Sequence, residues 1–151
     1  MMQVCGPRTL NGDPKMNSPS VIVILGLVAW TLLLLIAMEL LRTRLILAKA
    51  VAANALQPDN ANLSPFMQRL ARAHANCFES IPFFIALLLV AVLTGHTGIT
   101  DALAPWLLGA RVFQSSVHVA SLSLVAVNVR FLAFAFQVGI AVYWCIALFA
   151  A

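Results

Sequence analysis

The sequence predicts an all-α membrane protein, a bundle of four transmembrane helices, and two observations support this prediction. Of the 151 residues, 62% are hydrophobic and only 9% are charged, whereas about a quarter of a soluble domain is charged. The apolar residues also gather in four long runs, at 20–47, 66–93, 101–122 and 125–151. About 20 such residues suffice for a helix to cross a bilayer. The composition therefore excludes a soluble globular domain.

Residues 1–19 precede the first run and contain Gly, Pro, Asn and Asp, which are typical of irregular structure. We therefore predict a disordered N-terminal tail, followed by one membrane domain over residues 20–151. Two possible starts of the protein, Met1 and Met16, remain open. No small-residue cleavage site follows the first run before Glu39, so we interpret this run as a retained span and not as a cleaved signal.

The positions of the basic residues predict the orientation. Basic residues flank the connection between the first two runs, while the connection at 94–98 and the C-terminus carry none. By the positive-inside rule, the first and third connections face the cytoplasm and both termini lie outside. The net charge of +4 thus indicates membrane anchoring and not nucleic-acid binding, and the short connections favour a bacterial inner membrane. Three of the flanking cations are interpreted as anchors that reach the lipid headgroups: Arg42, Arg44 and Lys49.

The second run, residues 66–93, begins with an unusual polar face. Arg72, Asn76 and Glu79 follow the spacing i, i+4, i+7, which places them on one side of a helix. Ionisable side chains are costly within a membrane, and they usually face a cavity or a partner. We therefore predict that these three side chains bind a polar ligand or an opposing charge.

The third run, residues 101–122, carries a second polar face. Arg111, Gln114 and His118 follow the spacing i, i+3, i+7 and so share one side of a helix. Counted at about 1.5 Å per residue from the cytoplasmic end, Arg111 comes out at a depth similar to that of Glu79. The sequence therefore allows an ion pair between these two residues.

The fourth run, residues 125–151, has Arg130 near its start, at the same side of the membrane. Two interpretations of the polar cluster remain open. The polar groups could simply join helices, because hydrogen bonds between polar side chains modestly stabilise helix packing within membranes. Alternatively, the surplus of Arg72, Arg111 and Arg130 over the single carboxylate of Glu79 indicates an anionic ligand, because a guanidinium group suits carboxylates.

The cysteines give no sign of a metal centre. Cys5, Cys77 and Cys145 are an odd number and lack the spacing of zinc ligands, so the sequence predicts neither a disulfide framework nor a metal site. Cys77 and Cys145 are interpreted as small apolar packing residues.

Two motifs in these runs resemble those of the MAPEG family, the membrane-associated proteins in eicosanoid and glutathione metabolism. The pattern Arg-Ala-x-x-Asn-x-x-Glu-x-x-Pro, from Arg72 to Pro82, is similar to the second-helix signature of the family. The pattern Gly-Ala-Arg that ends at Arg111, with Gln114 and His118 after it, is similar to the third-helix motif. The resemblance extends over nearly the whole chain after the tail.

The resemblance implies a homotrimer of four-helix subunits in the lipid bilayer. Glutathione, the cosubstrate, would be held between neighbouring subunits on the cytoplasmic side, and no metal would be needed. Arg72, Asn76 and Glu79 would bind the charged ends and amide groups of glutathione. Arg111 would pair with Glu79 or reach the tripeptide.

The resemblance also assigns roles to residues in the second half of the third run and near the start of the fourth run. Gln114 and His118 stand where eukaryotic members usually have a His or Tyr and a Tyr, and both would contact glutathione. The imidazole of His118 could replace the hydrogen bond of the tyrosine, but not its geometry. Arg130 would be the catalytic residue, an arginine that stabilises the glutathione thiolate. Phe131 departs from the serine found beside this arginine in the prostaglandin E synthase.

Three hypotheses for function follow. The first is a glutathione-dependent membrane transferase or peroxidase, in which the thiolate attacks a lipophilic electrophile or reduces a lipid hydroperoxide. The second is a non-catalytic family member that binds glutathione or a lipid anion, or acts as a scaffold. The third is a transporter or channel subunit, which is disfavoured because the outer halves of the second and fourth runs carry no charges. The sequence does not encode the identity of the electrophile.

Overall fold

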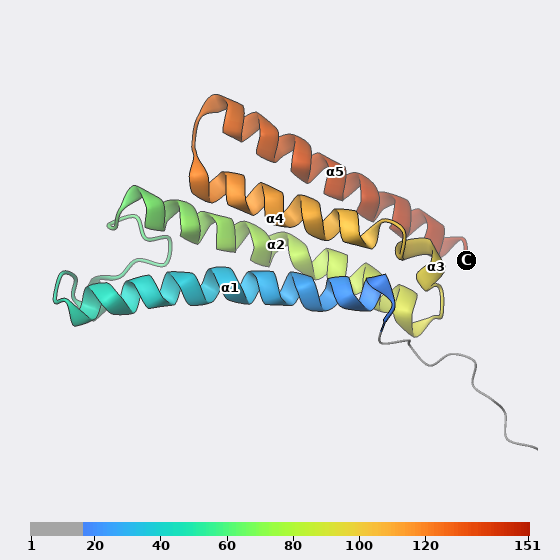
Figure 1. The fold of residues 1–151 in the computed structure, drawn as a ribbon, viewed down its shortest axis with the longest axis horizontal. Helices are drawn as coiled ribbons and strands as arrows, with labels where there is room; N and C mark the ends of the chain where they lie inside the picture. Colours follow the sequence, from blue (N-terminus) through green and yellow to red (C-terminus); the bar gives the residue numbers. More distant parts are fainter. Residues whose placement is uncertain (1–16) are drawn as a thin grey trace, which may run out of the picture.

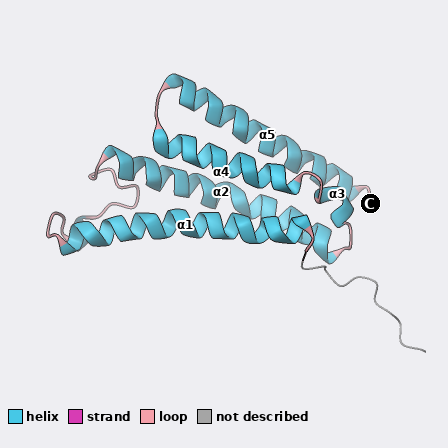
Figure 2. Ribbon diagram, in the orientation of Figure 1, coloured by secondary structure: helices cyan, strands magenta, loops and turns pink. Residues whose placement is uncertain are grey.

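A computed structural model describes residues 17–151, which fold into helices joined by turns and loops (Figure 1). The predicted tail lies outside the described residues up to residue 16. Figure 2 shows that the described part contains helices and loops alone. Four main helices build the fold: α1 (Pro19–Leu47), α2 (Pro65–Leu93), α4 (Ala104–Ala120) and α5 (Leu124–Phe149). Two short elements lie in the connections: the 3-10 helix η1 (Ala53–Ala55) and α3 (Thr97–Thr100).

The main helices run up and down through one bundle. α1 and α2 form one antiparallel pair and α4 and α5 form another, with α4 packed against both α1 and α2 (Figure 1). α5 packs chiefly against α4. As a result, the start of α2, the end of α4 and the start of α5 meet at one end of the bundle, while α3 and the C-terminus lie at the other.

Three of the main helices, α1, α2 and α5, are long and apolar enough to cross a membrane. The all-α four-helix prediction is confirmed, but the third predicted span, residues 101–122, is corrected at both ends. α4 has 17 residues, about 26 Å of helix, which is shorter than the apolar core of a typical bilayer. It begins at Ala104 because Pro105 lacks an N–H and fits a helix only in its first turn.

The ends of α2 are fixed by local sequence. Ser64 caps the N-terminus, since its Oγ accepts a hydrogen bond from the backbone N–H of Met67, and Pro65 occupies the first turn. At the other end, Gly95 has a φ of 77° in the left-handed region. The backbone N–H of His96 then donates 2.8 Å to a carbonyl oxygen in the last turn, which is a Schellman ending. The predicted turn at 94–98 therefore forms, although α3 occupies its second half.

Close packing joins the two helix pairs. A Cβ atom at Gly26 of α1 would lie 2.6 Å from Leu108 Cδ2 of α4, so a larger residue there would require the side chain of Leu108 to shift. Deeper in the core, Leu27, Leu88 and Trp144 are fully buried. On the outer faces of α1 and α5 many large apolar side chains are instead exposed, which suits helices that face lipid.

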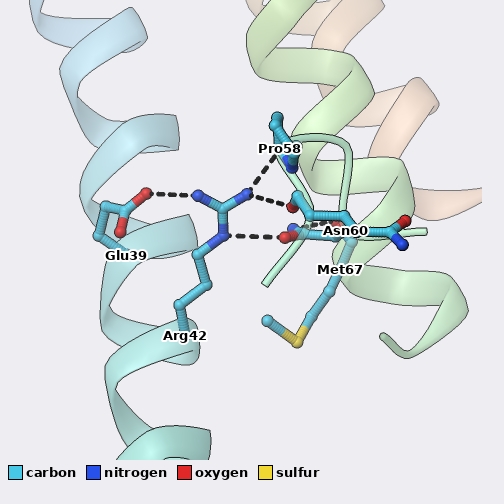
Figure 3. A network of polar contacts seen from close by, with 6 residues as sticks. Glu39, Arg42, Pro58, Asn60 and Met67 are labelled. Carbon is cyan, nitrogen blue, oxygen red and sulfur yellow. Dashed lines mark hydrogen bonds and ion pairs between the residues drawn. The ribbon is translucent and has the colours of Figure 1, made fainter. Parts of the chain in front are cut away.

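The connection between α1 and α2 is held by Arg42 (Figure 3). Its guanidinium donates to Glu39 Oε1 at 2.9 Å, to Asn60 Oδ1 at 2.8 Å and to the carbonyl oxygens of Gln57 and Pro58. Asn60 is fully buried with a left-handed φ of 58°, which asparagine tolerates. Arg42 therefore stabilises the connection between α1 and α2, which corrects its interpretation as a lipid anchor. Arg44 and Lys49 are exposed.

At the opposite end of the bundle, Asp101 caps α1 from outside that helix. One carboxylate oxygen accepts hydrogen bonds from Ser18 Oγ at 2.8 Å, Ser20 Oγ at 2.7 Å and the backbone N–H of Ser20 at 3.0 Å. Burial alone would raise the pKa of Asp101, but the hydrogen bonds from Ser20 and Ser18 hold this pKa below its ordinary value. The charge also complements the positive end of the helix dipole.

Replacing Asp101 by alanine is expected to lower the free energy of unfolding by about 1–2 kcal/mol, because the first turn of α1 loses its cap. The pKa of Asp101 is lower in the folded protein, so the stabilisation is present above its unfolded pKa and is lost as the pH falls through its folded pKa. The difference in melting temperature between wild type and Asp101→Ala in detergent should therefore be full at pH 7 and should shrink as the pH falls below the unfolded pKa of about 3.9. Asp59→Ala, in an exposed loop, is the control. A gap that does not shrink at all as the pH is lowered from 7 through the acidic range would argue against a role for the charge.

Candidate functional site

A cavity of about 340 Å³ opens at the end of the bundle where α2 begins, α4 ends and α5 begins. Polar side chains from all three helices contribute to its wall, and apolar side chains surround them. The lining residues are Arg72, Asn76, Gln114, His118, Leu122, Val127, Arg130, Phe131 and Phe134. Five of the seven predicted site residues thus share one cavity, which we call the cationic cavity.

Arg69 sets the relative position of α2 and α4 at this end. Its Nε donates 2.7 Å to the carbonyl oxygen of Val119, in the last turn of α4. The last carbonyl groups of a helix have no partner within the helix, so this bond satisfies one of them and ties the two helices together. Arg72, just under one turn further along α2, then lies in the same cavity wall as His118 from α4.

The charges of the cationic cavity are unbalanced. Arg72 and Arg130 line it, and no carboxylate from residues 17–151 does. Arg72 is exposed in the single chain, whereas Arg130 is half-buried, and its Nη1 atom is buried without a hydrogen-bond partner among the described residues. His118 is half-buried. Two guanidinium groups without a counter-charge make this cavity suitable for an anion.

Four side chains form a hydrogen-bonded series that begins in the wall of the cationic cavity, and we call this series the amide ladder: Arg111, Asn76, Gln114 and Gln137. Arg111 Nη1 donates 2.9 Å to Asn76 Oδ1, and Gln114 Nε2 donates 3.4 Å to the same oxygen. Gln137 Nε2 donates 2.9 Å to Gln114 Oε1 and 2.8 Å to the carbonyl oxygen of Ala133. The ladder therefore links α2, α4 and α5, with Asn76 and Gln114 in the cavity wall and Arg111 and Gln137 outside it.

Arg111 lies deep in the bundle and outside the cavity wall. Its side chain is 0% exposed, and its Nε and Nη2 atoms have no hydrogen-bond partner among residues 17–151. The guanidinium carbon lies 5.4 Å from the ring centre of Phe84 and 6.0 Å from that of Phe134. The negative faces of aromatic rings attract cations, so these two rings partly take the place of a counter-ion.

The predicted ion pair between Glu79 and Arg111 is not formed in the described chain, where Arg111 contacts Asn76 instead. At 3.6 residues per turn, Glu79 points about 60° away from Asn76 around α2. It also lies one turn further along the helix. Asn76 therefore faces α4, while Glu79 is exposed on the surface of the single chain.

Glu79 lines a second cavity of about 450 Å³ between α2 and α5. Asn76 and Phe134 belong to the walls of both cavities, so the two cavities adjoin. The rest of the second wall is mostly apolar: Ser80, Phe83, Phe84, Leu87, Val138, Ala141, Val142 and Cys145. We call it the apolar cavity. A polar and an apolar compartment thus lie side by side.

Sequence reasoning did not single out Gln137, which is 0% exposed and completes the amide ladder. A signal was present, because Gln137 is the one amide side chain in the apolar stretch 131–151. Polar groups at such positions usually face the interior of a bundle. The phenylalanines beside Arg111 gave no signal, because phenylalanines recur along the second and fourth runs.

The cysteines within residues 17–151 are free. Cys77 is buried, with its Sγ 3.3 Å from Ser115 Oγ of α4, and Cys145 is half-buried. No group of three His, Cys, Asp or Glu side chains suited to a metal ion occurs in this part of the chain.

These features define a class of protein: an all-helical membrane bundle with a cationic cavity at one end and an apolar cavity next to it. The chain belongs to the MAPEG family, because the sequence profile of that family matches residues 20–150. It is therefore an integral, multi-pass membrane protein, and many members of its family are glutathione-dependent enzymes. Comparisons with curated proteins and with solved structures gave no match.

Proposed function

We propose that this protein is a glutathione-dependent membrane transferase or peroxidase. The observation that supports this most is the cationic cavity: among the described residues, Arg72 and Arg130 line it without a carboxylate, and Arg130 Nη1 has no hydrogen-bond partner. Glutathione carries two carboxylates and one ammonium group, so it is a net anion. The volume of about 340 Å³ also falls in the range of small-molecule sites.

The remaining side chains suit the other groups of glutathione. Gln114 and His118 can hydrogen-bond to the peptide groups and a carboxylate. Glu79 can pair with the ammonium group, since it lies in the adjoining cavity and shares Asn76 with the cationic one. In this arrangement Arg111 acts through Asn76 and does not touch glutathione.

The proposed chemistry is electrostatic. A thiol has a pKa of about 8.5 in water, and a nearby cation lowers it because the thiolate is the charged form. Arg130 would hold the glutathione thiolate, with the released proton passing to water. The thiolate then forms a carbon–sulfur bond to an electrophilic carbon, which either expels its leaving group as an anion or, in an addition, yields a carbanion that takes a proton from water. Alternatively, two glutathione molecules reduce a hydroperoxide to an alcohol and water, and are themselves oxidised to the disulfide.

The lipid bilayer would supply the second substrate. Lipophilic electrophiles and lipid hydroperoxides partition into the membrane, and the apolar cavity between α2 and α5 adjoins the cationic one through Asn76 and Phe134. We further propose a homotrimer whose sites face the cytoplasm. The exposure of Arg72 and Glu79 in the single chain supports a neighbouring copy at this face, because exposed charges in a membrane are costly.

Calorimetric titration with glutathione tests the proposal. The wild-type protein in detergent should bind glutathione saturably, and Arg72→Ala and Glu79→Ala should each weaken binding by about 10- to 100-fold, as the loss of a charged hydrogen bond predicts. Arg44→Ala, an exposed arginine on α1, should bind like wild type. Absence of binding to well-folded wild-type protein would overturn the glutathione assignment and favour a role of the polar residues in joining helices.

One observation favours a second function, a non-catalytic protein that binds glutathione or serves as a scaffold. His118 lines the cationic cavity, at the position where eukaryotic members of the family usually have a tyrosine, so the ligand can be held in a different geometry. Turnover decides between the two functions. A catalytic protein should conjugate glutathione to a generic aromatic electrophile or consume a lipid hydroperoxide, whereas a binding protein should do neither while it binds glutathione.

A further inference from the structure

We infer that Gln137 is a positioning residue that holds the side-chain amide of Asn76 with its NH₂ group available to the ligand. The inference rests on the proposed glutathione site and goes beyond it, because Gln137 does not line either the cationic or the apolar cavity. It follows from the polarity of the amide ladder, by which we mean the direction in which each hydrogen bond is donated. This direction is fixed independently at both ends of the ladder.

At one end, Arg111 fixes the orientation of Asn76. A guanidinium group has only donors, so the Asn76 atom that lies 2.9 Å from Arg111 Nη1 is the oxygen. The oxygen and nitrogen of an amide are told apart by their partners. The nitrogen of Asn76 is thereby left outside the ladder, and it makes no hydrogen bond within residues 17–151.

At the other end, the carbonyl oxygen of Ala133 fixes the orientation of Gln137. A carbonyl oxygen only accepts, so the Gln137 atom that contacts it at 2.8 Å is the nitrogen. The same nitrogen donates 2.9 Å to Gln114, which must therefore present its oxygen to Gln137. Gln114 consequently presents its nitrogen to Asn76, and the orientation reached from this end agrees with the one set by Arg111.

The middle contact is the weakest part of the ladder and shows why Gln137 is needed. The distance from Gln114 Nε2 to Asn76 Oδ1 is 3.4 Å, longer than a typical N–H···O bond. Without the donor of Gln137, the amide of Gln114 would lose the partner that fixes its orientation. Gln114 would then be held only by its 3.4 Å contact with Asn76 Oδ1, so this contact would form less often and Arg111 alone would position the amide of Asn76.

The consequence is a rule for ligand recognition. Asn76 lines both cavities, and its oxygen is occupied by two donors from within the protein. It can therefore offer only N–H donors to a bound molecule. The group of the ligand at this point must be an acceptor, such as a peptide carbonyl or a carboxylate oxygen, which glutathione can supply.

Two substitutions test the inference by glutathione titration. Asn76→Asp replaces the donor by an acceptor of the same shape, so glutathione affinity should fall by about tenfold or more. Gln137→Met removes the distant donor at similar volume, and affinity should fall several-fold although residue 137 does not touch the ligand. Asn128→Asp, exposed on α5, and Ile140→Met, buried on α5, are the matched controls and should bind like wild type.

Melting temperatures test the ladder without any ligand. If the ladder uses only the oxygen of Asn76, then Asn76→Asp should melt no lower than wild type, since a carboxylate accepts both bonds. Asn76→Leu should melt lower, because it leaves Arg111 Nη1 buried without a partner. Gln137→Met should melt within a few degrees of wild type, because the change also removes Oε1 of Gln137, which is buried without a partner among the described residues.

Each part can fail separately. A lower melting temperature for Asn76→Asp would overturn the polarity of the ladder. Wild-type glutathione affinity in Gln137→Met would overturn the positioning role, and wild-type affinity in Asn76→Asp would overturn the donor rule. If wild type binds no glutathione, the proposed function fails, and the melting temperatures of the Asn76 variants still decide whether the ladder has this polarity.

Discussion

Replacing Arg130 by leucine is expected to lower the rate of glutathione conjugation at pH 7 by about a hundredfold or more, the loss found when a donor to a developing charge is removed. Arg130 has an unpartnered, buried Nη1 atom on the wall of the cationic cavity. Without it, the pKa of the bound thiol should rise toward the value of about 8.5 in water. The rate should therefore recover in part above pH 8, where the thiolate forms without help.

The pH profile of the rate separates this role from a loss of folding. The rate of wild type should reach its plateau at a lower pH than the rate of Arg130→Leu. The profile of Arg130→Lys should lie between them, because lysine keeps the charge but lacks the planar guanidinium group. Arg44→Leu, exposed on α1, serves as the control for loss of an arginine. Equal profiles for wild type and Arg130→Leu would remove Arg130 from the chemistry and leave it a binding role at most.

Replacing Arg111 by alanine is expected to destabilise the protein more than any other substitution considered. The side chain is fully buried and contacts Asn76, Phe84 and Phe134, so the change leaves a cavity in the core. A cost of about 3 kcal/mol is typical of such truncations. It corresponds to a fall in melting temperature of about 6–12 °C for a protein of this size. Differential scanning fluorimetry in detergent measures it, with Arg44→Ala as the control.

Arg111→Met tests whether packing or charge carries this stability. A buried charge loses its hydration, and replacing it by an apolar side chain of similar volume is often neutral or stabilising. Arg111→Met should therefore melt close to wild type, even though the bond to Asn76 is lost. If Arg111→Met melts as low as Arg111→Ala, the hydrogen bond and the aromatic rings stabilise the protein more than packing does.

The local sequence sufficed to predict most of the helices. The ends of α2 follow from Ser64, Pro65 and Gly95, which act within a turn of their own position. The shortening of α4 was not predicted, because the apolar run continues past its ends. Asp101, expected at the start of a span, instead caps α1, and a contact between residues 81 apart leaves no local trace in the sequence.

In the candidate site, too, local sequence predicted some features and missed the contacts between distant residues. Spacing along a helix placed Arg72 and Asn76 on one face, and Gln114 and His118 on another, and the structure brings all four to one cavity with Arg130. Spacing did not decide which neighbour each side chain meets. Estimates of depth suggested a Glu79–Arg111 pair, but Arg111 contacts Asn76 instead. Glu79 lies about 60° around α2 from Asn76 and about one turn further along the helix.

Composition, run length and short motifs are properties of local sequence, and they were enough to predict a four-helix membrane protein of the MAPEG family. The burial of Arg111 next to Asn76, the place of Glu79 in a separate apolar cavity and the contact of Gln137 with Gln114 became visible only in the packed bundle. The reason is physical: these features depend on the rotation and register of packed helices. Small rotations summed over several helices change which polar atoms meet.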